Sequence, residues 1–154
     1  MAEKDKVNIL LVDDRPDKLL ALEAIVNELD ENILTASSGA DALRILLRHD
    51  VAVILLDVNM PIMDGFETAP LIRQRQNLEH TPIIFITGIN FNDNYISKGY
   101  SLGAVDYICA PVVPDILKAK IAVFIELYRS REQVRKQGEQ LLEASERRAA
   151  SLEW

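Results

Sequence analysis

Cysteine is almost absent from this chain, since Cys109 is the only one among 154 residues. A single cysteine cannot form a disulfide within the chain, which fits a reducing compartment. No apolar run approaches the ~18 residues that span a membrane, and the N-terminus, residues 1–6, is charged and lacks the apolar core of a signal peptide. These absences predict a soluble, cytoplasmic protein with no membrane contact, in which Cys109 is a small residue of a strand and not a reactive thiol.

Positive charge is also scarce, with 17 Lys and Arg against 24 Asp and Glu and a net charge of −7. Direct nucleic-acid binding needs a basic face, which this excess of acids opposes. Histidine is limited to His49 and His80, and neither stands in a helical context typical of a phosphodonor. We therefore expect no histidine kinase within the chain. No G-x-G-x-x-G follows the first apolar run, which argues against dinucleotide binding.

Short apolar runs alternate with helical patterns along most of the chain. Runs this short and this uniformly apolar are typical of strands buried on both faces of a parallel sheet. Apolar residues at helical spacing separate them, with a weak helix expected over 95–102 and a last one from about Asp115. Five such units predict an α/β fold, a doubly wound five-stranded parallel sheet flanked by helices. The strands are expected at 7–12, 33–36, 51–56, 83–86 and 106–109.

A loop marked by Pro61 and Gly65 follows the third of these runs. Asp64, with Glu67 three residues later, predicts a helix start capped by the Asp64 side chain. Pro70 comes soon afterwards and would remove a hydrogen bond and crowd the preceding turn. We therefore expect this helix to start late or to bend at Pro70.

Polar side chains stand where three of the apolar runs end. Asp13 and Asp14 follow the first run, Asp57 follows the third, and Thr87 follows the fourth. Parallel strands end at one edge of the sheet, and in open α/β sheets ligands bind at that edge. Three carboxylates there repel one another unless a cation neutralises them, and oxygen ligands with room for water suit Mg²⁺. The sequence predicts an acidic Mg²⁺ pocket in which Asp57 is singled out.

Simpler roles for these residues stay open on the sequence alone. Asp13 and Asp14 could cap the helix that begins near Pro16, because acids favour that position. Thr87 could be an ordinary strand-end residue. Arg15 could face the acidic pair or point to solvent. The pattern by itself does not choose between these roles and a metal pocket.

The order and spacing of these motifs, together with Gly103-Ala104-Val105-Asp106-Tyr107, resemble the receiver domain of two-component response regulators, a flavodoxin-like (CheY-like) fold. The likeness covers residues 7–127. It implies that Asp57 accepts a phosphoryl group from a phosphohistidine on a histidine kinase or phosphotransfer protein. It also implies a regulatory module that is not itself an enzyme, although it can be part of a larger signalling enzyme.

The resemblance assigns roles to the acidic residues and their neighbours. Asp14 and Asp57 would bind Mg²⁺ with the backbone carbonyl of Asn59, and Asp13 would act mainly through a water molecule. Thr87 would hydrogen-bond a phosphoryl oxygen and move toward it. Positioning and neutralisation by a metal are most of what phosphoryl transfer requires, so the chemistry agrees with this assignment.

The fifth strand carries one match to the family and one departure from it. Tyr107 matches the switch aromatic, which changes rotamer as the hydroxyl moves, although a plain core tyrosine is the simpler role. Ala110 stands before Pro111, where the family normally has a lysine that contacts the phosphoryl oxygens. Lys98 and Lys118 are the nearest lysines, and neither is at a strand end. The missing cation favours the alternative of a pseudo-receiver, a protein-binding module that works without phosphorylation.

A Mg²⁺-dependent hydrolase of similar architecture is a further alternative. That class uses an Asp nucleophile with a second acid two residues later. Here the residue two positions after Asp57 is Asn59. The sequence therefore favours the receiver over the hydrolase.

The end of the chain differs in composition from the rest. We expect a receiver domain over 1–127 and a helical extension over 128–154, rich in Arg, Glu and Gln. Leu127, Val134 and Leu141 recur every seven residues, which predicts a coiled-coil seam and a homodimer. The companion positions are poor in apolar residues, so a solvated helical tail is the alternative. Because the chain stops in mid-helix, we expect a fragment that leads to an output module.

Overall fold

The computed structural model describes residues 5–88, 98, 101 and 106–152. Within them the strands form one parallel five-stranded sheet in the order β2-β1-β3-β4-β5. This confirms the predicted doubly wound sheet. Residues 103–105 of the fifth motif, and all but 98 and 101 of the helix expected over 95–102, lie outside the described residues. The strands are β1 (Asn8–Val12), β2 (Asn32–Ala36), β3 (Val53–Asp57), β4 (Ile83–Thr87) and β5 (Asp106–Cys109).

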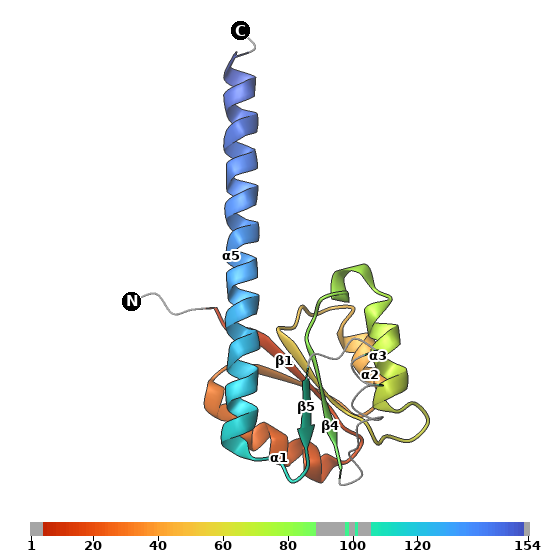
Figure 1. Cartoon of the computed structure of the whole chain (residues 1–154). Helices are drawn as coiled ribbons and strands as arrows, with labels where there is room; N and C mark the ends of the chain where they lie inside the picture. Colours follow the sequence, from red (N-terminus) through yellow and green to blue (C-terminus); the bar gives the residue numbers. More distant parts are fainter. Residues whose placement is uncertain (1–4, 89–97, 99–100, 102–105, 153–154) are drawn as a thin grey trace.

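Helices cover both faces of the sheet (Figure 1). Side chains alternate between the faces along each strand: Ile9 and Leu11 pack toward α1 and α5, whereas Leu10 and Val12 pack toward α2 and α3. Because both faces are covered, each strand is apolar at successive positions. This is the pattern from which the strands were predicted. The helices are α1 (Pro16–Val26), α2 (Gly39–Ile45), α3 (Gly65–Arg73) and α5 (Pro114–Leu152), with short 3₁₀ turns η1 (Asn27–Leu29) and η2 (Gln76–Leu78).

The capping prediction for α3 is confirmed, since the Asp64 side chain accepts a hydrogen bond from the backbone N–H of Glu67 at 2.8 Å. Of the two outcomes expected for Pro70, a late start or a bend, the late start is wrong, because the helix begins directly at Gly65 and runs through Pro70. The cap fixes the first turn, and burial of Phe66 and Ile72 against the sheet outweighs the hydrogen bond that the proline removes.

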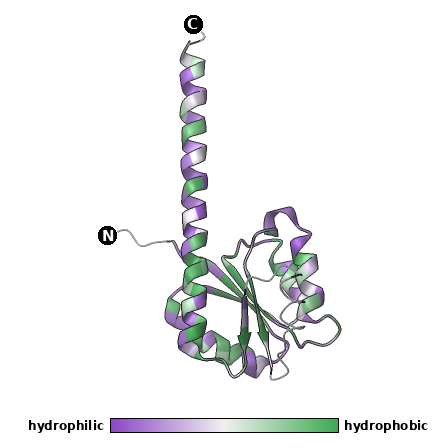
Figure 2. Cartoon of the chain, in the orientation of Figure 1, coloured by the Kyte–Doolittle hydropathy of each residue, from purple (hydrophilic) through white to green (hydrophobic). Residues whose placement is uncertain are grey.

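Helix α5 has a packed part and a free part. Leu117, Ile121 and Ile125 recur every fourth residue and are buried against the sheet. From Gln133 to Ser151 every residue is exposed, and this part projects away from the sheet as a mostly polar helix (Figures 1 and 2). None of the described helices is both long enough and apolar enough to cross a lipid bilayer.

Ion pairs hold α5 to the domain where it leaves the sheet. Arg129 donates to both carboxylate oxygens of Glu31 at 2.9 Å, and the Glu31 carboxylate also accepts from the backbone N–H of Val7 at 3.1 Å. Further along the sheet, Lys120 pairs with Asp106 at 2.6 Å. A paired charge that also has backbone hydrogen bonds orients a helix more firmly than a fully exposed pair does.

Candidate functional site

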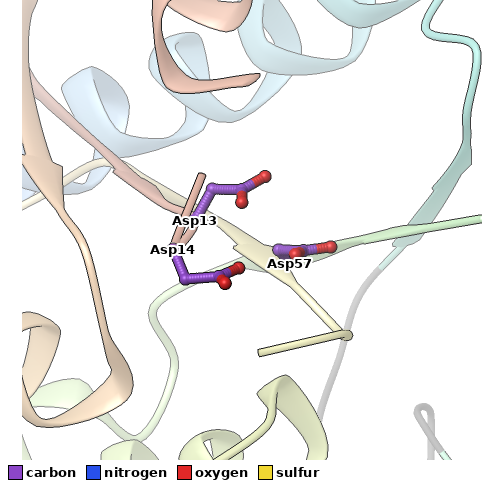
Figure 3. Close-up of side chains that lie close together, drawn as sticks. All are labelled: Asp13, Asp14 and Asp57. Atoms are coloured by element: carbon purple, nitrogen blue, oxygen red, sulfur yellow. The ribbon is translucent and has the colours of Figure 1, made fainter. Parts of the chain in front are cut away.

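Three carboxylates gather at the carboxyl edge of the sheet, as predicted. Asp57 ends β3, and Asp13 follows β1 beside it, because Val12 pairs in register with Leu56. Asp13 and Asp57 are 1% and 3% exposed, and Asp14 is half-buried. One oxygen from each of the three carboxylates lies within 4.8 Å of the others, and Figure 3 shows them side by side.

Two oxygens of this acidic cluster (Asp13, Asp14 and Asp57) lack a partner. Oδ1 of Asp14 and Oδ2 of Asp57 are buried and have no hydrogen-bond donor among the described residues. A buried carboxylate oxygen without a partner is costly, and a hard cation with oxygen ligands satisfies several such oxygens at once. The donor set of the cluster, which is made of carboxylates alone, therefore fits Mg²⁺.

The electrostatics of the acidic cluster also favour a bound cation. Burial, and then the charge of Asp13, raises the pKa of Asp57 to about 6, against the opposing effects of the Lys18 charge and a hydrogen bond from the Asn59 backbone N–H. Burial also raises the pKa of Asp13, opposed by the Arg15 backbone N–H at 3.0 Å and by Lys18. The fold thus holds two carboxylates where ionisation is unfavourable without a compensating cation.

The role of a simple helix cap for the acidic pair does not match the geometry. The N-cap residue of α1 is Arg15, and no side chain caps that helix. The Arg15 guanidinium turns to Asp17 at 3.2 Å, so it does not pair with the acidic cluster. Of the two orientations that the sequence allowed for Arg15, the structure has the one that points away from the carboxylates.

Thr87 lies at the same edge of the sheet as Asp57. It ends β4, is buried, and stands one residue beyond Ile86, the register partner of Asp57. The backbone N–H of Ala110 donates to the Thr87 carbonyl at 2.7 Å. Ala110 therefore follows β5 at the edge where the acidic cluster opens, and it brings no charge there.

Tyr107 is buried below this edge, on the face covered by α2 and α3. Its ring packs against Phe85 with a centroid distance of 5.6 Å, and Phe85 meets Phe66 edge-on at 4.9 Å. Lys98 lies over the Phe66 ring at 5.1 Å, and Lys118 pairs with Glu28. The nearest lysines in sequence thus have other contacts.

The loop after β3 passes close to the backbone of Asp57. The side chain of Asn59 is exposed, so only its backbone faces inward. A Cβ added to Gly65 would stand 2.5 Å from the Asp57 carbonyl oxygen, and the Gly65 N–H donates to Val58 at 3.0 Å. Only glycine allows this approach. Ile62, at the exposed tip, has φ 68°, which is strained for a β-branched residue.

Sequence reasoning missed two contributors, Lys18 and Gly65. The signal for Lys18 was its place four residues after Asp14, in the first turn of the expected helix. The signal for Gly65 is the Asp-Gly pair at the start of α3, a pattern that by itself predicts only a turn and a helix cap.

Comparisons with known proteins agree with this geometry. The family model described as the response regulator receiver domain matches residues 9–122. Among curated proteins, a probable cyclic di-GMP phosphodiesterase of Vibrio cholerae is 33% identical over 153 residues, which make up 99% of this chain and 34% of that protein. The chain spans about a third to a half of the length of several curated relatives that it matches.

Two solved structures extend the likeness to the fold. The chemotaxis protein CheY4 of Vibrio cholerae superimposes with a TM-score of 0.73 at 25% identity, over 77% of this chain and 98% of that one. The receiver domain of a sensor histidine kinase from Pseudomonas aeruginosa has a TM-score of 0.72 at 27% identity, over 79% of this chain and 98% of that one. The latter holds a magnesium ion coordinated in its active site cleft.

Proposed function

This chain belongs to the response regulator receiver domain family, and on that premise we propose that Asp57 is the phosphoryl acceptor of a two-component relay. Receiver domains are regulatory and interact with histidine kinases or phosphotransfer proteins. The observation that carries the proposal is the Oδ2 atom of Asp57, which is buried, unpartnered and within the acidic cluster. A carboxylate held in this way is positioned as a nucleophile for a phosphoryl group.

Asp14 and Asp57, with the backbone carbonyl of Asn59, would hold Mg²⁺, and Asp13 would hold it through a water molecule. When bound, the ion supplies neutralisation of the carboxylates and of the phosphoryl oxygens. Support comes from the oxygen donors of the acidic cluster and from the magnesium ion in the related Pseudomonas aeruginosa structure.

In the transfer step the Asp57 carboxylate attacks phosphorus. The bond from phosphorus to the donor nitrogen breaks, and its electron pair leaves with the donor imidazole. Thr87 stands at the same edge and would hydrogen-bond a phosphoryl oxygen. Tyr107, behind it on β5, would then change rotamer and couple the movement of the hydroxyl to a surface of the domain.

The acceptor role can be tested with acetyl phosphate and Mg²⁺. We expect wild type to gain one phosphoryl group, visible by intact mass and on a phosphate-affinity gel, and Asp57→Asn to gain none. Asp64→Asn is the matched control, because asparagine also caps a helix and Asp64 lies outside the acidic cluster.

The uncharged Ala110 favours a second candidate function, a pseudo-receiver that binds partners without phosphorylation. The two candidates differ in one result. If wild type and Asp64→Asn both stay unmodified under conditions that modify another receiver domain, the acceptor role is wrong and the pseudo-receiver replaces it.

We also propose that the extension over 128–154 pairs two copies of the chain in parallel. Val123, Leu127, Val134 and Leu141 lie on one helix face, at spacings of four and seven residues, and are 57%, 52%, 68% and 72% exposed in the single chain. A seam of this spacing is buried when two helices wrap around each other. The polar companions Ser130 and Gln137 weaken the seam, so the dimer is modest in affinity.

Leu141→Glu is the sharpest test of this pairing. Each chain loses roughly 1.5–3 kcal/mol of leucine burial and gains a charge facing its copy, so we expect dimerisation to weaken by at least about tenfold. Leu142→Glu is the control, because Leu142 is equally large, 60% exposed, and about 100° around the helix. Sedimentation equilibrium gives both constants. Equal effects of the two variants, or a monomeric wild type, would contradict the seam.

A further inference from the structure

The acidic cluster has little positive charge around it. Among the described residues, no lysine or arginine forms a salt bridge with Asp13, Asp14 or Asp57. Arg15 turns away to Asp17, and Ala110 is uncharged. An incoming phosphoryl group adds two further negative charges to this place, so the site needs a cation other than the metal to attract it.

Lys18 is placed to supply that charge. It is the third residue of α1, which begins at Pro16, two residues after Asp14. Side chains of a helix tilt toward its N-terminus, and here that end adjoins the acidic cluster. Lys18 is exposed and forms no ion pair with any residue that the structure describes, so its ammonium is available to a ligand.

The electrostatics agree with this placement. The Lys18 charge lowers the pKa of Asp13 and that of Asp57, in each case against the raising effect of burial. Asp13 follows β1 and Asp57 ends β3, so one lysine acts on carboxylates from two different strands. A single charge that acts on both carboxylates lies near the cluster that they form.

We propose that Lys18 is the phosphoryl-binding cation of this site, with its ammonium contacting the oxygens of the group that Asp57 receives. The inference rests on the proposed acceptor role of Asp57. With acetyl phosphate as donor, the Asp57 oxygen forms the new bond to phosphorus. The bond between phosphorus and the acetyl oxygen breaks, and acetate leaves with the electron pair. No proton is needed, and Lys18 stays charged throughout.

This role has a signature that a merely structural role lacks. A positive charge at the mouth of the cluster attracts the phosphoryl donor but repels Mg²⁺ from the carboxylates. Removing it should therefore slow phosphorylation and tighten Mg²⁺ binding at the same time. Each effect is expected to be about three- to tenfold, the size of one partly screened charge interaction. Damage to the fold would weaken both.

The variants are Lys18→Met, which keeps the length of the side chain, and Lys18→Arg, which keeps its charge. Lys6→Met is the control, because Lys6 precedes β1 at the opposite edge of the sheet and pairs with Asp30 on the surface. Phosphorylation rates are measured with acetyl phosphate at fixed, saturating Mg²⁺. Mg²⁺ affinity is measured separately by calorimetry, without phosphodonor.

We expect Lys18→Met to react more slowly and to bind Mg²⁺ more tightly, Lys18→Arg to resemble wild type, and Lys6→Met to change neither quantity. A normal rate in Lys18→Met overturns the proposal, as does a joint loss of rate and Mg²⁺ affinity. A wild type that is never modified contradicts the acceptor role itself, and this inference with it. A modified wild type with an unaffected Lys18→Met variant contradicts only the role of Lys18.

Discussion

Asp57→Asn is expected to stabilise the metal-free chain at pH about 8 by up to about 3 kcal/mol, the equivalent of raising a carboxyl pKa from 3.8 to about 6. The sign follows from the direction of the shift. The folded chain holds the proton of Asp57 more tightly than the unfolded chain does. The proton on Asp57 therefore stabilises folded wild type fully below pH 3.8, and this contribution is lost as the pH rises through about 6. Asparagine carries no charge and avoids that loss.

Urea unfolding with a chelator present, at pH about 4 and about 8, measures this difference. The difference in free energy of unfolding between Asp57→Asn and wild type should be small in acid and should grow as the pH rises through the pKa of Asp57. Asp64→Asn is the matched control, because Asp64 lies outside the acidic cluster and asparagine also caps a helix. A pH-independent gap would mean that burial does not penalise the Asp57 charge.

Saturating Mg²⁺ should reverse the order of stability at pH about 8. A ligand that binds only the folded state stabilises it by mass action, about 4.1 kcal/mol at a thousandfold excess over the dissociation constant, which exceeds the difference of up to about 3 kcal/mol between the metal-free proteins. Wild type keeps its full set of carboxylates and should gain most, whereas Asp57→Asn loses one donor of the cluster and should gain little. If Mg²⁺ stabilised wild type and Asp57→Asn equally, the ion would bind at a site that does not include Asp57.

The sheet and the acidic edge could be predicted because one physical rule fixed both. Strands such as β3 are buried on both faces, so each reads as an unbroken apolar run, and the polar residue that ends the run marks the strand end. Parallel pairing then brings the ends together. The convergence of Asp13 and Asp57 therefore needed no knowledge of side-chain packing, only of strand order and direction.

The roles of Lys18 and Gly65 could not be predicted, because they depend on distances in the folded chain that the periodicity of the sequence does not specify. Whether a lysine in the first turn of α1 faces an acidic cluster depends on how that helix leaves the sheet. The glycine at 65 is required by a 2.5 Å approach to the Asp57 carbonyl oxygen, which appears only once the β3–α3 loop is folded. The start of α3 was mispredicted for a related reason, because the Asp64 cap and burial of the helix outweigh the local cost of Pro70.

Ala110→Lys is expected to raise the rate of phosphorylation by acetyl phosphate by roughly tenfold or more. Ala110 adjoins Thr87 through a 2.7 Å backbone hydrogen bond, so a lysine there extends from the edge that carries Asp57. A well-aligned charge-assisted hydrogen bond to a phosphoryl oxygen contributes about 1.5–3 kcal/mol, which acts on the rate if the contact forms in the transition state. Phosphate-affinity gels at fixed Mg²⁺ follow the kinetics.

Combining this change with Lys18→Met decides what the new lysine does. If Lys18 in α1 and a lysine at position 110 after β5 serve the same phosphoryl group, Ala110→Lys should restore most of the rate that Lys18→Met loses. The gain should then be larger in that background than in wild type, because the effects of residues that share one ligand are not additive. If the new lysine instead pairs statically with Asp57, it blocks the metal, and Mg²⁺ affinity and rate fall together in both backgrounds. A wild type that is never modified, beside an Ala110→Lys variant that is, would identify the natural chain as a pseudo-receiver whose phosphorylation was lost with that one cation.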